Sequence, residues 1–497
     1  MNAQVRRVAV VVLVGFLVLF AAPLYWQVLA ADRLNNDPRN SRVLIDEYSI
    51  ERGQIVLSDG TVVAQSRATK DQLKYQRRYP QGRRYGMITG FDSLVFGRTL
   101  TESRFNSFLL GKAPEQFAQN LSDLLTARPN PGGTVMLTLS PAAQRAAEES
   151  LGQRKGAVVA LDPTTGAVLA MTTLPRYDPN LLSSHKTDEV RKAWNRLTKD
   201  PDEPLLNRAA GQLYPPGSTF KIITAAAALS NGMSPDTARP NEHTYTPPQT
   251  TRAIQNFGGE TCLGGKNPLT MAEAIEVSCN TWFAHLGVDL GTSKLVDQAE
   301  RFGLNDSIHF QLPGAAKSQI PTELDPPSRA QSAIGQRDVR VSPLQMASVI
   351  AAVANGGQRM APYVVDRVLS SDGKTVKRFK PESLGEAVSP QVADQLKGML
   401  RLVVNGPAGT GSAAQIPGLD VFGKTGTAQH GTQERPHAWF VGATSKAGAG
   451  GARKSIAVAA IVEDGGNLGS EATGGREAAP IVRAVMDAYL NGNGGSR

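Results

Sequence analysis

Residues 214–229 read YPPGSTFKIITAAAAL, and the other motifs of the chain can be placed around this stretch. Two prolines and a glycine end any helix before it, whereas the alanine-rich run after it strongly favours a helix. Ser218 is therefore expected to begin a helix, with Lys221 one turn later on the same face. Backbone N–H groups at such a position stabilise an oxyanion, and a partly buried lysine can be neutral enough to accept the serine proton. A lone Ser-x-x-Lys is more often a helix cap beside a solvated lysine, so further motifs are needed.

The composition is that of an ordinary globular protein. The 497 residues are 41% hydrophobic and 20% charged, and the length allows two or three domains. A net charge of +9 arises from 53 basic and 44 acidic residues spread without blocks, which fits a chain beside an anionic membrane or wall polymer. No basic run is interleaved with aromatic residues, so nothing supports nucleic-acid binding.

The N-terminal segment predicts a membrane anchor over residues 1–31. Arg6 and Arg7 precede residues 8–26, which carry no charge. A helix of that length spans about 28 Å, close to the hydrocarbon core of about 30 Å. The arginines predict a cytoplasmic N-terminus and an extracytoplasmic remainder. A cleaved signal peptide is the alternative, because residues 28–30 read VLA, but the apolar stretch is longer than a usual signal core.

Residues 32–155 are expected to form a small, partly β pedestal, of the kind that serves as a dimerisation-like domain. Its short β-type runs at 45–64 are split by Asp59-Gly60, as in a hairpin. The other elements expected there are a helical pattern over 101–127, a strand at 135–139 and a helix over 142–151. The pedestal shows no cluster typical of catalysis.

Residues 156–490 predict a domain of the α/β class (α+β type). Two runs at 157–162 and 167–171 indicate a buried hairpin, helical segments fill the middle, and strands return between 422 and 462. A helix over 478–490 precedes a flexible tail at 491–497. Strands at both ends of the segment predict one antiparallel sheet flanked by helices. The proline-, threonine- and glycine-rich residues 241–266 are typical of a functional loop.

Two further motifs follow the serine and lysine along the chain. Ser278 and Asn280 lie two positions apart between two expected helices. The segment KTGT at 424–427 lies on a strand, where alternation points Lys424 and Gly426 to one side and Thr425 and Thr427 to the other. A glycine there leaves the backbone open to a ligand. The order Ser-x-x-Lys, Ser-x-Asn, Lys-Thr-Gly is the motif set of penicillin-binding proteins and class A β-lactamases.

The chain thus resembles the penicillin-binding protein and serine β-lactamase superfamily, and more closely the class B penicillin-binding proteins of the actinobacterial penicillin-binding protein A type. The resemblance covers the anchor, the start of the pedestal and residues 156–490. The segments that carry it, besides the three motifs, are RGQI at 52–55, SAIGQ at 332–336, VSPLQM at 341–346 and AWFVG at 438–442. The chain departs from the family in its cysteine between Ser278 and Asn280 and in its short pedestal.

The resemblance implies a transpeptidase fold and a peptidoglycan D,D-transpeptidase that cross-links stem peptides during cell division or shape maintenance and is acylated by β-lactams. Ser218 would attack the carbonyl between two D-alanines, Lys221 would take its proton, and Ser278 would relay that proton to the leaving amine. Asn280 would hold the substrate amide. The residues expected to bind the terminal carboxylate or to line the oxyanion hole are Lys424, Thr425, Gly426 and Thr427. Neither a metal nor an organic cofactor is implied.

The same resemblance implies partners outside the chain. Residues before 156 leave no room for a glycosyltransferase domain, so a membrane polymerase of the RodA/FtsW type is expected to make the glycan. The alternative is a membrane-anchored sensor or scaffold that β-lactams acylate without turnover. Such sensors carry several spans and a cytoplasmic effector, whereas one span is expected here, which favours the enzyme.

Three local patterns point elsewhere and are given less weight. Residues 418–425 match the phosphate-binding P-loop pattern, but they read as a strand that no helix follows. Glu203 begins a Glu-x-x-Leu-Asn pattern like that of the deacylating glutamate in class A β-lactamases, yet it precedes Ser218 instead of following it. Of the six histidines, His430 and His437 are expected on a hairpin rim beside the site, not as zinc ligands.

Cys262 and Cys279 are the chain's only cysteines, and they lie seventeen positions apart. Outside the cytoplasm we expect them to form a disulfide that ties the loop to the Ser278–Asn280 motif, which contributes about 3 kcal/mol in the chain-entropy model. The alternative is a small buried thiol at Cys279 and an exposed one at Cys262.

Overall fold

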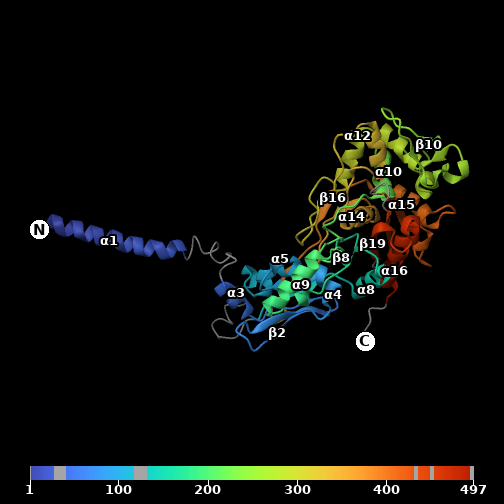
Figure 1. The fold of residues 1–497 in the computed structure, drawn as a ribbon. Helices are drawn as coiled ribbons and strands as arrows, with labels where there is room; N and C mark the ends of the chain where they lie inside the picture. Colours follow the sequence, from blue (N-terminus) through green and yellow to red (C-terminus); the bar gives the residue numbers. More distant parts are fainter. Residues whose placement is uncertain (1, 27–40, 117–130, 430–434, 448–452, 493–497) are drawn as a thin grey trace.

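The computed structural model describes residues 2–26, 41–116, 131–429, 435–447 and 453–492 (Figure 1). Its first helix is α1 (Asn2–Leu24). A window of 18 residues within Ala3–Leu24 has a mean hydropathy of 2.5, so this helix is long and apolar enough to cross a membrane. That is consistent with the expected anchor, while residues 28–30 of the alternative cleavage site lie outside the described residues.

The downstream part of the chain is built on a five-stranded antiparallel sheet with the order β17-β18-β19-β7-β8. Its strands are β7 (Gly156–Leu161), β8 (Val168–Leu174), β17 (Phe422–Ala428), β18 (His437–Ala447) and β19 (Arg453–Val462). The prediction that both ends of the segment complete one sheet is confirmed, because β19 pairs directly with β7. Strand β17, which carries the KTGT segment, is at the edge of this order.

Helices cover both faces of this sheet, since its inner strands are apolar on both sides (Figure 1). Val158 and Ala160 of β7 belong to the core formed with α8 and α16, whereas Val159 and Leu161 belong to the core that includes α10 and α14. The helices of this part are α8 (Pro141–Leu151), α9 (Thr187–Lys199), α10 (Lys221–Ser230), α11 (Met271–Glu276), α12 (Asn280–Arg301), α13 (Pro326–Ala333), α14 (Pro343–Ala354), α15 (Pro390–Asn405) and α16 (Ala479–Asn491). The sheet is therefore the central layer of the domain.

The pedestal is a mixed six-stranded sheet with the order β15-β14-β6-β1-β2-β3. Its strands are β1 (Ile55–Val56), β2 (Val62–Ala68), β3 (Tyr75–Arg78), β6 (Thr134–Leu137), β14 (Val365–Leu369) and β15 (Thr375–Arg378). Strands β1 and β2 pair antiparallel across Asp59-Gly60, so the expected hairpin is confirmed. Two strands come from residues 365–378, and α8 packs on α16, so contacts cross the boundary expected near residue 155 in both directions.

Short elements complete the pedestal and the loops. The pedestal also contains α3 (Ser41–Tyr48), α4 (Gly82–Thr89), α5 (Leu100–Arg104), α6 (Asn106–Leu109), β4 (Asp92–Ser93) and β5 (Gly97–Arg98). Two-stranded ribbons downstream use β9 (Ala238–Arg239), β10 (Thr244–Tyr245), β11 (Ile254–Gln255), β12 (Leu269–Thr270), β13 (Gln358–Met360) and β16 (Ser383–Glu386).

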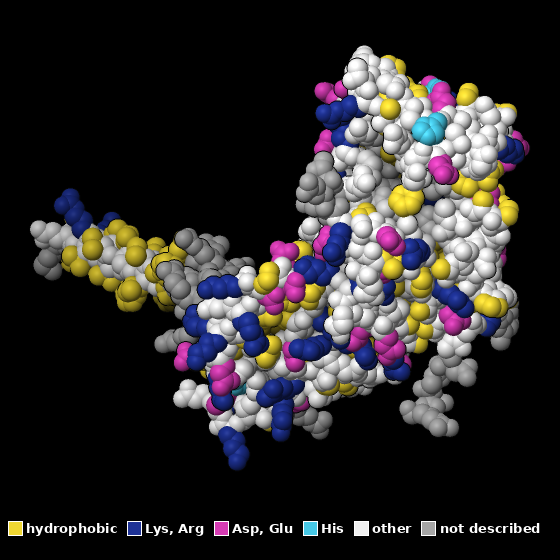
Figure 2. Space-filling view, turned by 45° about the vertical axis from the view of Figure 1, so that its right-hand side comes forward, with side chains coloured by type: hydrophobic (Ala, Val, Ile, Leu, Met, Phe, Trp, Pro, Cys, Tyr) yellow, Lys and Arg dark blue, Asp and Glu magenta, His cyan; other side chains and the backbone are white. Residues whose placement is uncertain are grey.

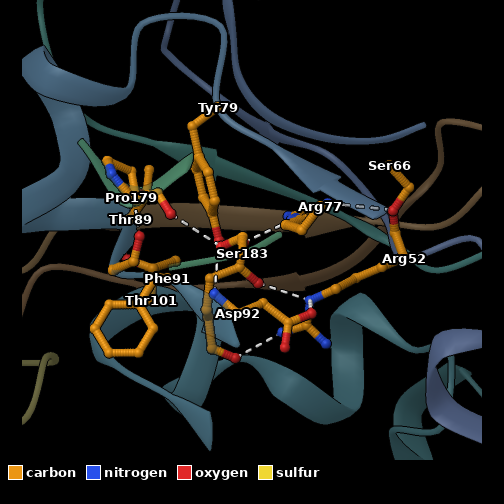
Figure 3. Close-up of polar contacts among 12 residues, drawn as sticks. Arg52, Ser66, Arg77, Tyr79, Thr89, Phe91, Asp92, Thr101, Pro179 and Ser183 are labelled. Carbon is orange, nitrogen blue, oxygen red and sulfur yellow. Dashed lines mark hydrogen bonds and ion pairs between the residues drawn. The ribbon is translucent and has the colours of Figure 1, made fainter. Parts of the chain in front are cut away.

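A cluster of opposite charges is buried inside the pedestal (Figure 3). Arg52 and Arg77 donate from Nε to the two carboxylate oxygens of Glu102, each at 2.6 Å. Asp92 accepts from Arg98 at 2.9 Å and lies 3.8 Å from Arg52 Nε. Burial is the largest influence on the pKa of Arg77 and lowers it, but the charge and hydrogen bond of Glu102, together with Tyr79 and Asp92, shift that pKa upward overall. Arg52, the arginine of the RGQI segment, is thus part of a buried network of ion pairs.

Candidate active site

Ser218 lies on a tight turn at the edge of a large cavity. The turn Gly217–Phe220 is a single 3₁₀ segment that leads directly into α10, so the helix starts three residues later than the serine. The Gly217 N–H donates to the Gly335 carbonyl at 2.9 Å, and Trp439 Nε1 donates to the Pro215 carbonyl at 3.1 Å. The cavity beside Ser218 has a volume of about 980 Å³. These bonds fix the backbone on both sides of the hydroxyl.

Lys221 is fully buried one turn beyond the serine. Its Nζ donates to Asn280 Oδ1 and to the Ser278 carbonyl, both at 2.7 Å. Burial, and then the nearby charge of Lys424, lower the pKa of Lys221 well below its ordinary value. No ion pair to a carboxylate is found for either lysine among the described residues. The site therefore favours the neutral amine at position 221.

Ser278 stands between the two lysines. Lys424 Nζ donates to its hydroxyl at 2.8 Å, and Lys221 Nζ lies 3.4 Å from the same oxygen. Ser278 has a φ of +60°, a left-handed conformation that costs free energy in a non-glycine residue. Burial lowers the pKa of Lys424 to about 7. One hydroxyl thus bridges two amines whose proton affinities are both reduced.

The KTGT segment forms the wall of the cavity opposite this serine. Thr425, Gly426 and Thr427 all line the cavity, while Lys424 is buried behind it. A Cβ on Gly426 would lie 2.9 Å from Thr219 Cγ2 and 3.0 Å from the Pro216 carbonyl. The glycine expected to admit a ligand also gives room to the turn that carries Ser218. The side chains of Thr425 and Thr410 share a hydrogen bond of 2.7 Å.

A disulfide joins Cys262 to Cys279, whose Cα atoms are 5.8 Å apart. It attaches the loop before α11 to the residue between Ser278 and Asn280. Asn256 reinforces this attachment, because its Oδ1 accepts from the backbone N–H of Asn280 at 2.9 Å and of Thr281 at 3.0 Å. The loop expected to be functional therefore forms one side of the cavity.

Two residues of this arrangement, Asn256 and Thr410, were not among the sequence-based candidates. Both lie in irregular segments without a motif, so only the long loop at 241–266 gave an indirect signal for Asn256. All the candidates, by contrast, come together: Ser218, Ser278, Asn280, Thr425, Gly426 and Thr427 line one cavity, with Lys221 and Lys424 buried directly behind it.

Comparisons with known proteins agree with this geometry. Residues 156–487 match the family model described as the penicillin binding protein transpeptidase domain, and residues 52–135 match the penicillin binding protein A dimerisation domain. The chain belongs to the penicillin-binding protein transpeptidase family. Similar proteins include the peptidoglycan D,D-transpeptidase PbpA of Mycolicibacterium smegmatis, which is 42% identical over 99% of each chain. The one from Mycobacterium tuberculosis H37Rv is 40% identical over 99% of this chain and 100% of the relative.

Solved structures of a penicillin-binding protein share the fold. The ceftriaxone acyl-enzyme complex of M. tuberculosis penicillin-binding protein A has a TM-score of 0.84 and 38% identity, covering 90% of this chain and 100% of that one. The penicillin G acyl-enzyme complex has a TM-score of 0.81 and 38% identity, covering 88% and 99%. The recognised family and the predicted transpeptidase fold are thereby confirmed.

The structure also places the three local patterns that point to other functions: the P-loop match, the Glu203 pattern and the two histidines. Residues 422–428 form the edge strand β17, so the P-loop reading of residues 418–425 is wrong. Glu203 lies on a turn, its carboxylate 3.9 Å from Arg208, and it is not among the residues that line the cavity. His437 is not a rim residue but is buried at the start of β18, where its ring packs against that of Tyr214. His430 lies outside the described residues.

Proposed function

We propose that this chain is a serine D,D-transpeptidase that cross-links peptidoglycan stem peptides in cell division or shape maintenance, and that β-lactams acylate it at Ser218. The observation that carries the proposal is the pair of buried lysines around Ser278, beside a serine on the turn that leads into α10. The solved relatives from M. tuberculosis support it, since they are acyl-enzyme complexes with ceftriaxone, imipenem and penicillin G.

The first step is attack of Ser218 Oγ on the carbonyl between two D-alanines. A neutral Lys221 amine has two N–H groups and one lone pair, and both N–H groups are occupied by Asn280 and the Ser278 carbonyl. The lone pair is then left to accept the serine proton. The proton passes through the Ser278 hydroxyl to the leaving amine, so the C–N bond breaks as the Ser218 ester forms. The reaction needs no metal or organic cofactor.

The second half of the site holds the substrate. The terminal carboxylate binds to Lys424 and to the hydroxyls of Thr425 and Thr427, because charge-assisted hydrogen bonds favour this chemistry. Backbone N–H groups of Ser218 and Thr427 stabilise the oxyanion, and Gly426 keeps the strand close to the serine turn. The amine of a second stem peptide then attacks the ester and releases Ser218.

We further propose a division of labour along the chain. Residues 1–31 anchor it in the membrane with the N-terminus in the cytoplasm, 32–155 form most of the pedestal, 156–490 carry the catalysis, and 491–497 form a tail. A RodA/FtsW-type glycosyltransferase supplies the glycan. Lys and Arg side chains gather over the pedestal in the face shown in Figure 2, which suits a position near anionic lipid. Recovery of residues 1–31 in salt-washed membranes supports the anchor, whereas Ala31 as the mature N-terminus contradicts it.

The test of the function compares this chain with its Ser218→Ala variant. Labelling with a fluorescent penicillin should give a band for the first and none for the second. Mass spectrometry of the labelled peptide should find the adduct on Ser218 alone. An adduct on Ser278, or equal labelling of both proteins, would overturn the assignment.

A further inference from the structure

One side of the active-site cavity is an arch formed by residues 257–261. Both of its ends are fixed. Asn256, at the start, accepts from two backbone N–H groups of α12 and donates from Nδ2 to the Glu260 carbonyl at 3.1 Å. Cys262, at the end, is bonded to Cys279, and the side chain of Asn241 donates to its carbonyl at 2.6 Å. The arch is therefore held against the Ser278–Asn280 wall.

The arch presents two side chains of complementary character. Among the described residues that line the cavity, Glu260 is the only one with an ionisable side chain. Its carboxylate is exposed and forms no hydrogen bond or ion pair within the parts of the chain that the structure describes. Phe257 lines the same cavity and is 74% exposed. Among the described residues beyond Trp26, no other large hydrophobic side chain is as exposed.

This pairing matches one chemical group, an aminoalkyl side chain. A ring offers apolar surface to methylenes and attracts a cation to its face, and a carboxylate attracts the ammonium at the end of the chain. Although the protein has a net charge of +9, the carboxylate of Glu260 on the arch attracts a cation to this side of the cavity.

We infer that the arch, through Phe257 and Glu260, binds the side-chain ammonium of the diamino acid in a stem peptide. The inference rests on the proposed transpeptidase function. Two stem peptides can supply that group: the donor, which carries it next to the D-alanine whose carbonyl is attacked, and the acceptor, whose ammonium must approach before it loses its proton. Phe257 and Glu260 act as specificity residues, outside the chemical step.

The donor arm of the test uses two thioesters of Nα-acetyl-L-lysyl-D-alanine with mercaptoacetic acid, one with a free side-chain amine and one with that amine acetylated. If the donor uses the arch, the wild-type protein should be acylated by the thioester with the free amine roughly 1.5 to 5 times faster, as an exposed ion pair allows. Glu260→Gln should lose this preference, and added salt should reduce it in the wild type. Glu242→Gln is the matched control, since that carboxylate belongs to the same loop but does not line the cavity.

The acceptor arm starts from the acyl-enzyme made with the acetylated thioester and adds Nα-acetyl-L-lysine amide. If the acceptor uses the arch, Glu260→Gln lowers the ratio of aminolysis to hydrolysis while the donor preference stays unchanged. Phe257→Ser should weaken both thioesters by a similar factor. In all variants benzylpenicillin, which has no ammonium, should acylate at the wild-type rate.

Failure of this inference can be distinguished from failure of the proposed function. If Glu260→Gln changes neither the donor preference nor the aminolysis ratio while penicillin acylation remains, the inference is wrong and the proposed function stands. If the wild-type protein is acylated by neither thioester nor penicillin, the proposed function fails and the inference fails with it.

Discussion

The pedestal and the active site each bury a pair of basic side chains, but they treat the charge in opposite ways. In the pedestal, Arg52 and Arg77 share the carboxylate of Glu102, which is completely buried. In the active site, Lys221 and Lys424 share the neutral hydroxyl of Ser278. The arginines are balanced by a carboxylate within hydrogen-bond distance, whereas the lysines have no such carboxylate in the part of the chain that the structure describes.

The difference shows how one chain uses burial for two purposes. Arginine keeps its charge in proteins, so a buried arginine requires an anionic partner. The resulting ion network in the pedestal serves stability. Lysine changes its pKa readily, so burial without an acid lowers the pKa of both lysines and favours the neutral amine that Lys221 needs to act as a base. We therefore expect changes in the active site to alter the acylation rate, and changes in the pedestal to alter stability.

The largest effect is expected from Lys221→Ala, which removes the base. Acylation of Ser218 by benzylpenicillin should fall by on the order of 10²- to 10⁴-fold, because that is what a positioned general base contributes. Stopped-flow or gel-based rate constants measure it. Lys221→Arg, which keeps a basic side chain that cannot lose its proton, should be nearly as slow. A rate within tenfold of the wild type in either variant would exclude the lysine as the base.

The next effect is expected in the pedestal, where Glu102→Gln leaves two buried arginines without their shared anion. Removing one partner of a buried ion pair costs about 3–5 kcal/mol of unfolding free energy, which urea denaturation can measure. Glu115→Gln is the control, because the pair of Glu115 with Lys377 is exposed and screened by water, so its loss should change the unfolding free energy little. Acylation of the folded protein should be unchanged. Equal unfolding free energies of the two variants would contradict the claim that the ion network around Glu102 stabilises the pedestal.

A smaller effect is expected from Asn280→Asp, which places a carboxylate next to a buried basic side chain, as in the pedestal. A carboxylate at Asn280 Oδ1, 2.7 Å from Lys221 Nζ, would raise the pKa of that lysine. Less neutral amine remains at pH 7, so acylation should slow roughly 10- to 100-fold and recover in part as the pH rises. Asn280→Ala removes the bond without adding charge and should leave the pH of half-maximal rate in place. The same pH profile in both variants would contradict the argument.

The smallest effect concerns Lys424, whose pKa burial lowers to about 7. Below that pH the side chain is protonated and binds a carboxylate, and above it the attraction weakens. The ratio of acylation rates for benzylpenicillin and its methyl ester should therefore fall, by up to about tenfold, between pH 6 and pH 8. Lys221 affects both ligands alike, so the ratio isolates Lys424. A ratio that stays constant over this range would exclude carboxylate binding by a titrating Lys424.

The elements that carry Ser218, Lys221 and Lys424 could be predicted from local sequence. Pro215 to Lys221 and the KTGT strand are short segments whose backbone is dictated by proline, glycine and alternation, so their elements were predictable. The residues that complete the site were not. Thr410, Asn256 and Glu260 lie in irregular segments, and their positions depend on bonds to residues far away in the chain, such as Thr410 to Thr425. His437 was misplaced because β18 begins earlier than expected and buries it. Strands β14 and β15 join the pedestal sheet across more than 200 positions, which no local pattern encodes.

The most direct test of the account is the pH dependence of the acylation rate constant of Ser218 with benzylpenicillin, measured from pH 5 to pH 10. The account predicts that the rate rises along a limb well below pH 10 and then levels, because the pKa of Lys221 is lowered by burial and by Lys424. It would be contradicted by a rate that keeps rising to pH 10, as an ordinary lysine of pKa about 10.4 would give.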